Sequence, residues 1–307
     1  MKRIAVINDI SGFGKCSLTA ALPVISALGI EACPLPTAIL SNQTGYPSFF
    51  CTDYTENLYS YIDEWRKMGV KFDGILTGYI TSVKQAEIIC EFVEEFADGN
   101  SLVFVDPVMA DDGVLYDTYD KALCEKVKKL TKKANIITPN LTELCIICGV
   151  DYEKISRENN VREIAKIAAS LLTDTLKTVI VTGVKNSDEI QNIIVDKNGE
   201  AVVKSRLIGG SYSGTGDLFS SVVCAEAVKG KSILHAVNLA TVFLQKSIED
   251  TYKENTDRNY GVNFQQHLEV LIYEQEQKSH YKHCNNCSFC FADCTYDISN
   301  QNADRHK

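Results

Sequence analysis

The chain is organised around a glycine-rich stretch near its end, Gly209-Gly210-Ser211-Tyr212-Ser213-Gly214-Thr215-Gly216-Asp217. The stretch follows a β-rich segment and leads into Leu218–Ala225, an apolar run that we expect to be a buried helix. Its four glycines within eight residues allow the backbone to turn tightly and to approach a ligand closely. The start of the helix adds unpaired N–H groups and the positive end of the helix dipole, so the stretch is suited to bind an anion.

Asp217 is out of place in an anion site, because its carboxylate would repel a bound phosphate. A carboxylate is useful at this position if it acts as a general base that takes a proton from a reacting group. The alternative is structural, since an aspartate after a flexible loop often caps the helix that follows. The stretch alone leaves both interpretations open.

Length, composition and charge narrow the class of protein. The 307 residues suffice for one large α/β domain or two ordinary ones, and contents of 45% hydrophobic and 23% charged residues are typical of a globular protein. A net charge of −9 argues against nucleic acid or an anionic membrane as the main partner. The apolar run Ile4–Ile7 is too short for a signal peptide, and no apolar run has the length of a membrane span. We therefore expect a soluble, cytoplasmic protein.

The twelve cysteines fall into two groups. Eight are scattered between Cys16 and Cys224 within apolar segments, where free thiols serve as small core residues. The other four crowd near the end of the chain. This distribution differs from that of a small secreted scaffold held by disulfides.

Segments of strand and helix character alternate through the middle of the chain, which predicts a parallel sheet with helices on both faces. We expect strands and the loops that follow them at 4–7, 30–33, 74–79, 102–107, 134–140 and 178–183, and a hairpin at 191–195 and 201–204. We expect further helices at 17–28, 55–68, 83–96, 121–132, 141–148, 161–173 and 232–252. Pro34 and Pro36 limit the second strand to an edge or an end of the sheet.

Polar residues stand where these strands end. In such sheets ligands bind beyond the carboxyl ends of the strands, so we expect the polar residues to converge on one edge. They are Asn8, Asp9, Thr77, Tyr79, Asp106, Thr138, Asn140, Thr182 and Asp217.

Gly12-Phe13-Gly14-Lys15-Cys16-Ser17 has some features of two nucleotide-binding motifs but matches neither. A phosphate loop needs a glycine where Asp9 stands and a Ser or Thr where Cys16 stands. The dinucleotide motif needs a third glycine where Ser17 stands.

Two further motifs place acids at strand ends. Asp106-Pro107-Val108-Met109 ends a hydrophobic strand, where a carboxylate can serve a metal–phosphate complex or simply belong to a turn. In Thr138-Pro139-Asn140-Leu141-Thr142-Glu143, Asn140 or Thr142 can cap the next helix and Glu143 lies in its first turn. Helix capping and a metal role are both open for this second motif.

The combination of motifs in this order resembles the ribokinase-like superfamily and, within it, the pyridoxal (vitamin B6) kinases, over residues 1–270 or so. The matching pieces are Ser41-Asn42-Gln43-Thr44-Gly45-Tyr46, Gly78-Tyr79, Asp106-Pro107-Val108-Met109, Thr138-Pro139-Asn140-Leu141-Thr142-Glu143, Val181-Thr182-Gly183 and Gly214-Thr215-Gly216-Asp217. The last piece is shared by the whole superfamily, whereas the first two point to the B6 branch. The resemblance implies an α/β fold, a three-layer αβα sandwich with a central, mostly parallel sheet, formed by a kinase domain at residues 1–277.

The resemblance also implies an activity, the ATP-dependent phosphorylation of the 5'-hydroxymethyl group of a B6 vitamer. Asp217 would be the general base, and Gly214, Thr215 and Gly216 would form the anion hole for the transferred phosphoryl group. Mg²⁺ would be positioned by Asp106 and Glu143, and K⁺ is a further expected cation. ATP would be bound by Asn140, Thr182, Asp111 and Tyr116, the last two on a loop that covers it, and the pyridine ring by Asp9, Thr44 and Tyr79. Such kinases are usually homodimers.

The chain departs from the B6 kinases at two positions, since these often have Ser where Asp9 stands and His where Gln43 stands. Asp9 could pair with an amine and so favour pyridoxamine, or could only cap a helix or bind the ring hydroxyl. The hydroxymethylpyrimidine kinases of thiamine synthesis are the main alternative, although many have Cys where Asp217 stands. A sugar kinase is disfavoured by the small hairpin at 191–204. A non-catalytic nucleotide-binding protein on the same fold is disfavoured by the intact base and anion loop.

The composition changes after residue 277, and residues 278–307 are predicted to be a Cys-rich tail outside the kinase fold. Cys284, Cys287, Cys290 and Cys294 have the spacing of a bacterial ferredoxin cluster run. Thr295 stands in place of the usual proline, and the chain has no second run of this kind. Zn²⁺ on the four thiolates, with or without His283, is another interpretation, and a polar extension without metal is a third.

Overall fold

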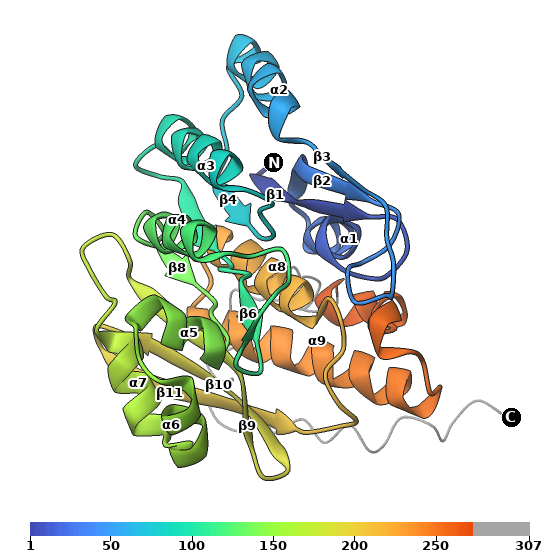
Figure 1. Ribbon diagram of the computed structural model, residues 1–307, viewed down its shortest axis with the longest axis vertical. Helices are drawn as coiled ribbons and strands as arrows, with labels where there is room; N and C mark the ends of the chain where they lie inside the picture. The colour runs from blue at the N-terminus through green and yellow to red at the C-terminus, as the bar shows by residue number, and fades with distance from the viewer. Residues whose placement is uncertain (273–307) are drawn as a thin grey trace, which may run out of the picture. The chain divides into compact units, whose positions relative to one another are not determined.

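The computed structural model of the chain describes residues 1–272 and has a nine-stranded sheet at its centre (Figure 1). The strands are β1 (Arg3–Ser11), β2 (Glu31–Leu40), β3 (Cys51–Asp53), β4 (Gly74–Thr77), β5 (Leu102–Val105), β8 (Ile136–Ile137), β9 (Thr178–Asn186), β10 (Glu189–Asp196) and β11 (Gly199–Arg206). Their order across the sheet is β11-β10-β9-β8-β5-β4-β1-β2-β3. The strands from β9 to β2 run parallel, and antiparallel pairs occur only toward the two edges of this sheet.

Helices cover both faces of the sheet. They are α1 (Ser17–Ala27), α2 (Thr55–Met68), α3 (Val83–Phe96), α4 (Lys121–Thr131), α5 (Leu141–Cys148), α6 (Tyr152–Glu158), α7 (Val161–Ala169), α8 (Thr215–Val228) and α9 (Ile233–Lys253). Side chains of β1 alternate between the faces, as strand geometry requires. Ala5 and Ile7 belong to the core with α2–α7, whereas Ile4 and Val6 belong to the core with α1, α8 and α9. The predicted three-layer α/β sandwich is confirmed.

The helix boundaries follow from local sequence. Ser82 and Asp120 each accept a hydrogen bond from the third residue of the helix that they precede, α3 and α4 respectively. Such caps stabilise a helix by about 1 kcal/mol, because they satisfy N–H groups that have no partner within it. Gly69 and Gly149 end α2 and α5 in the left-handed conformation that glycine adopts without strain. These signals are local, so the boundaries of α2, α3 and α5 agree with the predicted ones.

β1 and β2 extend well beyond their predicted ends. β1 continues through Asn8 and Asp9 to Ser11, where a loop was expected, and its pairing with β2 shifts register between Asn8 and Ile10. β2 contains both prolines, but at Pro34 and Pro36 it pairs only with β1, since β3 pairs with Ala38–Leu40. A proline lacks an N–H group but is tolerated where no neighbour needs one, so the expected edge character holds for this half of β2.

Several short elements were not predicted from the sequence. They are β3, α6, a two-stranded sheet of β6 (Ala110–Asp111) and β7 (Val114–Leu115), and the 3₁₀ helices η1 (Arg258–Tyr260) and η2 (Gln265–His267). Each is too short to display a clear hydrophobic period, which is the main signal for secondary structure. Within residues 1–272, none of the helices combines the length and the apolar character that crossing a membrane requires.

The predicted tail lies outside the described residues, and so do Cys284, Cys287, Cys290 and Cys294. The eight cysteines within residues 1–272 are free thiols. Four of these eight cysteines, Cys16, Cys124, Cys145 and Cys224, are buried. The prediction that these cysteines act as small core residues is therefore confirmed only for some of them, because Cys51 is exposed and Cys33, Cys90 and Cys148 are half-buried.

Candidate active site

The loop before α8 is packed backbone against backbone on the loop before α1. Gly214 has φ 79°, and a Cβ atom there would lie 2.0 Å from the Lys15 carbonyl oxygen. No side chain fits at that distance, so glycine is required both for the conformation and for the close approach. This contact brings the N-termini of α1 and α8 together at one edge of the sheet.

Asp217 lies between these helix ends. Its Oδ1 accepts a hydrogen bond from Asn8 Nδ2 at 2.9 Å, and its Oδ2 accepts one from the Ser17 backbone N–H at 2.8 Å. The N-cap residue of α8 is Gly214, so the interpretation of Asp217 as a helix cap is wrong. Asp217 stands instead in the first turn, and its side chain turns toward β1 and α1.

The electrostatic surroundings make Asp217 a weak acid. Burial raises its pKa to about 6, the hydrogen bond from the Ser17 N–H acts in the opposite direction, and the negative charge of Asp9 adds to the increase. A carboxyl group with this pKa is mostly ionised at neutral pH, yet is basic enough to accept a proton. The arrangement therefore favours a general base over a structural role.

Asn8 connects Asp217 to the neighbouring strand. Its Nδ2 donates to Asp217, and its Oδ1 accepts the backbone N–H of Tyr79 at 2.9 Å. A Cβ atom on Gly78 would lie 2.4 Å from Asn8 Nδ2, so the Gly-Tyr pair leaves room for this side chain. The sequence marked Asn8 as a polar strand-end residue but gave it no role, because the link to Asp217 spans 209 positions of the chain.

Asp106 follows β5 and lies beside the anion loop. Its backbone N–H donates to the Thr77 carbonyl oxygen at 3.0 Å, and a Cβ atom on Gly216 would lie 3.8 Å from its Oδ2. Burial, and after it the negative charge of Asp217, raises the pKa of Asp106 to about 8. A buried acid whose pKa is raised by a neighbouring carboxylate is typical of catalytic sites.

Glu143 and Asn140 form a capping box at the start of α5. Asn140 Oδ1 accepts the Glu143 backbone N–H at 2.9 Å, and Glu143 Oε2 accepts the Asn140 backbone N–H at 2.9 Å. Glu143 Oε1 accepts a third hydrogen bond, from the Met109 N–H at 3.0 Å. Burial, followed by the charge of Asp106, raises the pKa of Glu143 well above its usual value. The sequence left open whether this motif caps a helix or serves a metal, and the structure shows that Asn140 and Glu143 cap α5.

Carboxylate oxygens are the ligands that Mg²⁺ prefers, and we asked whether these residues suit it. Within residues 1–272, no three His, Cys, Asp or Glu side chains cluster closely enough to hold a metal ion. Asp106 and Glu143 nevertheless oppose each other's ionisation, and the nearby Thr77 hydroxyl is buried without a hydrogen-bond partner. A cation with water ligands would reduce the repulsion between the two carboxylates, and one of its waters could give the Thr77 hydroxyl a hydrogen-bond partner. Mg²⁺ usually keeps several waters. The residues therefore fit Mg²⁺ bound by few direct protein ligands.

The residues predicted to hold the substrate ring lie on the β1 and β2 side of Asp217. Asp9 is buried, and its Oδ2 accepts a hydrogen bond from the Ser11 hydroxyl at 2.9 Å. The negative charge of Asp9 acts on both Asp217 and Tyr79, so these three lie near one another. Thr44 is exposed on the loop 41–46, and within residues 1–272 its side chain forms no hydrogen bond with Asp9 or Tyr79.

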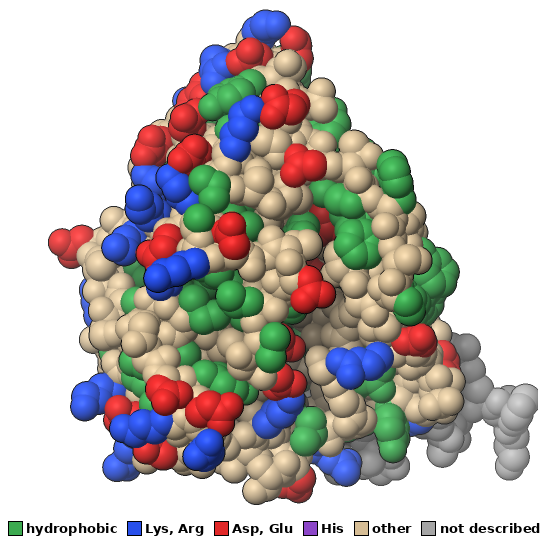
Figure 2. All heavy atoms as spheres, viewed as in Figure 1, with side chains coloured by type: hydrophobic (Ala, Val, Ile, Leu, Met, Phe, Trp, Pro, Cys, Tyr) green, Lys and Arg blue, Asp and Glu red, His purple; other side chains and the backbone are tan. Residues whose placement is uncertain are grey.

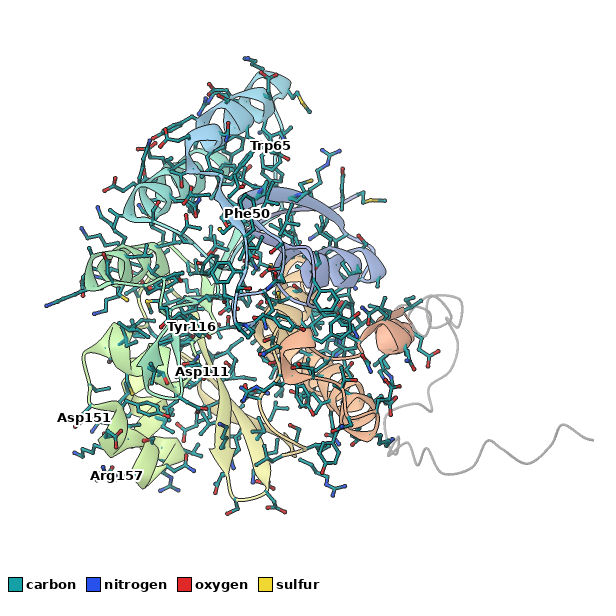
Figure 3. All side chains as sticks on the ribbon, turned by 45° about the vertical axis from the view of Figure 1, so that its right-hand side comes forward. Phe50, Trp65, Asp111, Tyr116, Asp151 and Arg157 are labelled. Atoms are coloured by element: carbon teal, nitrogen blue, oxygen red, sulfur yellow. The ribbon has the colours of Figure 1, made fainter. Side chains whose placement is uncertain are left out.

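The residues predicted to bind ATP lie on the β8 and β9 side. A backbone bridge joins Asn140 to Thr182, and Asn140 Nδ2 donates to the Ala110 carbonyl oxygen of β6 at 2.7 Å. Figure 3 shows Asp111 and Tyr116 near each other on the segment that contains β6 and β7. Burial, followed by the charge of Glu143, raises the pKa of Tyr116. Figure 2 shows a hollow in this face with acidic side chains along it.

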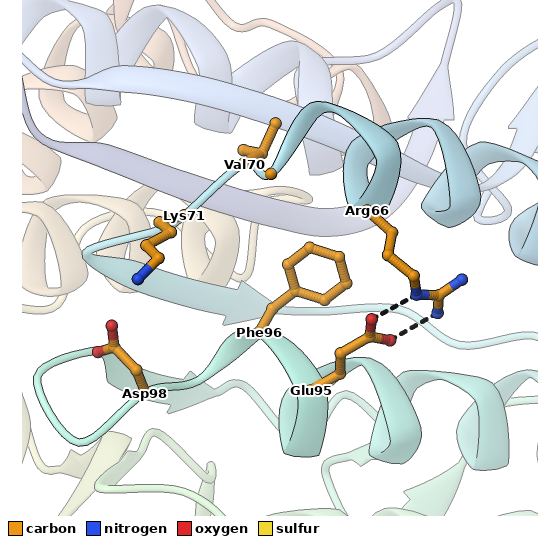
Figure 4. Close-up of a pocket in the computed structure, with 7 residues that line it drawn as sticks. Arg66, Val70, Lys71, Glu95, Phe96 and Asp98 are labelled. Carbon is orange, nitrogen blue, oxygen red and sulfur yellow. Dashed lines mark hydrogen bonds and ion pairs between the residues drawn. The ribbon is translucent and has the colours of Figure 1, made fainter.

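A separate cavity of about 270 Å³ lies by the C-terminal ends of α2 and α3 (Figure 4). The guanidinium of Arg66 forms two hydrogen bonds with the Glu95 carboxylate, one of them 2.6 Å long. The Arg66 and Glu95 side chains that line the cavity are therefore already paired with each other. The cavity contains none of the predicted site residues.

Comparison with known proteins places the chain in a family. The family described as phosphomethylpyrimidine kinase matches residues 14–262. A Bacteroides thetaiotaomicron protein assigned to the same kinases, in a crystal form with pyridoxal, has 34% sequence identity and a TM-score of 0.84. That match covers 88% of this chain and 95% of the other.

Two further relatives are named as B6 kinases. The crystal structure of pyridoxal kinase from Lactobacillus plantarum has 27% identity and a TM-score of 0.81, over 90% of this chain and 99% of that one. The pyridoxine/pyridoxal/pyridoxamine kinase of Bordetella avium is 26% identical over 250 residues, which are 78% of this chain and 82% of the relative. The chain therefore belongs to the phosphomethylpyrimidine kinase family, within the ribokinase-like superfamily.

Proposed function

We propose that this protein is an ATP-dependent kinase that phosphorylates the 5'-hydroxymethyl group of a B6 vitamer, namely pyridoxal, pyridoxine or pyridoxamine. The observation that carries the proposal is the placement of Asp217, which is held by Asn8 and the Ser17 N–H at the start of α8. The relatives named above supply the substrate class, because two are named as B6 kinases and one was crystallised with pyridoxal.

In the proposed reaction Asp217 accepts the proton of the substrate's primary alcohol, whose oxygen then attacks the γ-phosphate of ATP. Gly214, Thr215 and Gly216 are proposed to offer backbone N–H groups to the transferred phosphoryl group. Phosphoryl transfer depends mainly on positioning and on charge stabilisation, which a rigid helix start can provide. The two hydrogen bonds to Asp217 fix the direction of its carboxylate before the substrate arrives.

Mg²⁺ is proposed to be held by Asp106, with Glu143 acting through water. Both oxygens of Glu143 already accept backbone N–H groups, which leaves Glu143 less able than Asp106 to bind the ion directly. When bound, the ion would neutralise charge on the phosphates of ATP. Asn140, Thr182, Asp111 and Tyr116 are proposed to contact ATP, with K⁺ as a further cation.

The vitamer preference is proposed to depend on Asp9. The carboxylate is buried and lies close to Asp217, and its described side-chain hydrogen-bond donors, Ser11 and Ser17, are uncharged. An amine of the substrate would supply the missing positive charge, which favours pyridoxamine. Ser in place of Asp9 should shift kcat/KM from pyridoxamine toward pyridoxal. An unchanged ranking of the vitamers in Asp9→Ser would contradict this role.

Hydroxymethylpyrimidine kinase is the second candidate, and the description of the matching family favours it. One assay separates the two: ATP consumption by the purified protein with each B6 vitamer and with hydroxymethylpyrimidine. We expect kcat/KM to be higher for at least one B6 vitamer than for hydroxymethylpyrimidine. The reverse order would replace the proposed activity with the second candidate.

Three further proposals concern the whole protein. We propose a homodimer, which sedimentation equilibrium would test, and a cytoplasmic location, which cell fractionation would test. We also propose a kinase domain at residues 1–277 followed by a separate Cys-rich tail. Metal analysis of the protein with and without residues 278–307 tests whether the tail binds Zn²⁺ or an iron–sulfur cluster.

A further inference from the structure

A short segment after α9 contacts three loops of the site and has no role in the mechanism above. The segment comprises residues 258–261, that is η1 and Gly261, and is called the clasp below. It is distant in sequence from two of the loops that it contacts. These are the loop 13–16 before α1 and the loop 41–46, which contains the predicted ring contact Thr44 and is called the substrate loop.

The first contact is with the loop before α1. The Tyr260 carbonyl oxygen accepts the Lys15 backbone N–H at 2.9 Å. The Tyr260 ring lies 5.0 Å from the ring of Phe13 and 4.6 Å from Lys15 Nζ, centroid distances that suit aromatic and cation–π contacts. Two residues after Lys15, the N–H of Ser17 donates to Asp217.

The second contact is with the substrate loop, and Asn259 makes it from both its main chain and its side chain. The Asn259 carbonyl oxygen accepts a hydrogen bond from Gln43 Nε2 at 3.0 Å, and Asn259 Nδ2 donates to the Gly45 carbonyl oxygen at 3.1 Å. Gln43 is 7% exposed, and its Oε1 accepts the Gly45 N–H at 2.7 Å. The two side chains together hold the loop on either side of Thr44.

The third contact is with the glycine-rich loop before α8. The Arg258 carbonyl oxygen accepts the Ser213 N–H at 3.1 Å. Gly261 has φ 86°, and a Cβ atom there would lie 3.0 Å from the Lys15 carbonyl oxygen and 3.1 Å from that of Ser213. The clasp therefore contacts the loops before α1 and α8 through its backbone and the Tyr260 ring, and contacts the substrate loop through Asn259.

We propose that the clasp positions the substrate loop relative to the loops that hold Asp217, and that Asn259 is the positioning residue for the B6 vitamer. This inference rests on the proposed function. Asn259 acts through Gln43 and Gly45, so it sets the affinity for the vitamer and leaves the phosphate side of the site unchanged. Holding a loop in its binding conformation before the ligand arrives lowers the entropy lost on binding.

Two variants test the proposal. Asn259→Ala removes the contact to Gly45, and Asn259→Asp places an oxygen instead of a donor against the Gly45 carbonyl oxygen. We expect both to raise the KM for pyridoxal and its Kd by calorimetry about tenfold, the effect of losing one well-placed hydrogen bond. The KM for ATP, the Kd of ADP and the kcat at saturating pyridoxal should change less than about threefold.

The control is Asn238→Ala on α9, since Asn238 is exposed and likewise donates its side-chain N–H to a backbone carbonyl, that of Leu234. It should leave all these constants unchanged. The double variant Gln43→Ala with Asn259→Ala should raise the KM for pyridoxal by less than the product of the single effects, because both changes release the same loop.

Unchanged pyridoxal affinity in Asn259→Ala, or an equal loss of affinity for pyridoxal and ADP, would overturn the inference. A wild-type protein that neither binds nor phosphorylates pyridoxal would overturn the proposed function on which it rests. The wild-type assay is therefore read first, and the variants are interpreted only against an active enzyme.

Discussion

At the scale of single residues, the proposed chemistry depends on three acids whose pKa values are raised by burial. Asp217, Asp106 and Glu143 all have raised pKa values, and burial is the largest cause for each. The three differ in what surrounds them. Both carboxylate oxygens of Asp217 accept hydrogen bonds, and Glu143 forms part of a capping box. Asp106 interacts electrostatically with both of these acids.

Asp217→Asn tests the general base. The change keeps the shape of the side chain but removes the group that accepts the proton, so we expect kcat to fall about 10²-fold or more. ATP binding should persist, because the backbone of residues 214–216 is unaltered. Steady-state kinetics with a nucleotide titration checks both parts, and near-wild-type kcat would remove Asp217 from the mechanism.

The pH dependence of activity should report the same group. Asp217 accepts a proton only when ionised, and its pKa is about 6 in the free protein. We expect kcat/KM to be level above about pH 7 and to fall roughly tenfold per unit below about pH 6. In the Asp217→Asn variant, kcat/KM should no longer fall below pH 6 because of this group. Any pH dependence that comes from ionisation of the vitamer itself should remain.

The Asp106→Asn variant should be more stable than the wild type but less active. The pKa of Asp106 is raised to about 8, so the folded state holds a proton that the unfolded state releases, and this costs stability as pH rises from about 4 to 8. The stability that the Asp106→Asn variant gains over the wild type should therefore grow through that range and level off above it. Thermal unfolding at several pH values measures this, and activity should meanwhile fall by about 10²-fold.

At the scale of elements, the site is built from strand ends and helix starts. β1, β4, β5 and β8 end side by side, and the N-termini of α1, α5 and α8 lie at this edge. There the first N–H groups of a helix have no partner within it, and side chains such as Asp217 and Glu143 accept them. The junction between α1 and α8 depends on Gly214, which has no room for a side chain. A side chain at position 214 should therefore lower the stability of the fold and also displace Asp217, the proposed general base.

Gly214→Ala tests the junction. A Cβ atom would lie 2.0 Å from the Lys15 carbonyl oxygen, in a backbone conformation with φ 79°. We expect a loss of roughly 1–3 kcal/mol of stability or more, with loss of activity. Gly210→Ala is the matched control, because nothing lies within 4 Å of a Cβ atom there. Equal denaturation midpoints for the two variants would contradict the close packing.

At the scale of the whole molecule, one sheet with a core on each face carries the site. The described core and all the described site residues lie within Met1–Ile272. We expect a chain shortened to residues 1–277 to keep the kcat of the full protein within about twofold and its unfolding temperature within a few degrees. A loss of activity on truncation would show that the tail belongs to the kinase.

Much of the fold was predictable because its signals are local. The boundaries of α2, α3 and α5 follow from hydrophobic spacing and from caps within a few residues of each end. The extension of β1 through Asp9 was not predictable, since it depends on pairing with β2 more than twenty positions away. The pair β6–β7 is likewise too short for any periodic signal.

The sequence by itself determined the layered α/β fold, the glycine-rich loop and the group of polar strand ends, because spacing and residue type express these directly. Only the tertiary structure decided how the groups meet. It showed Asp217 turned away from its own helix cap toward Asn8 and Ser17, and it joined the clasp to the substrate loop through Asn259. The physical reason is that these contacts link positions about two hundred residues apart, and distances of that kind arise only when the sheet and its helices assemble.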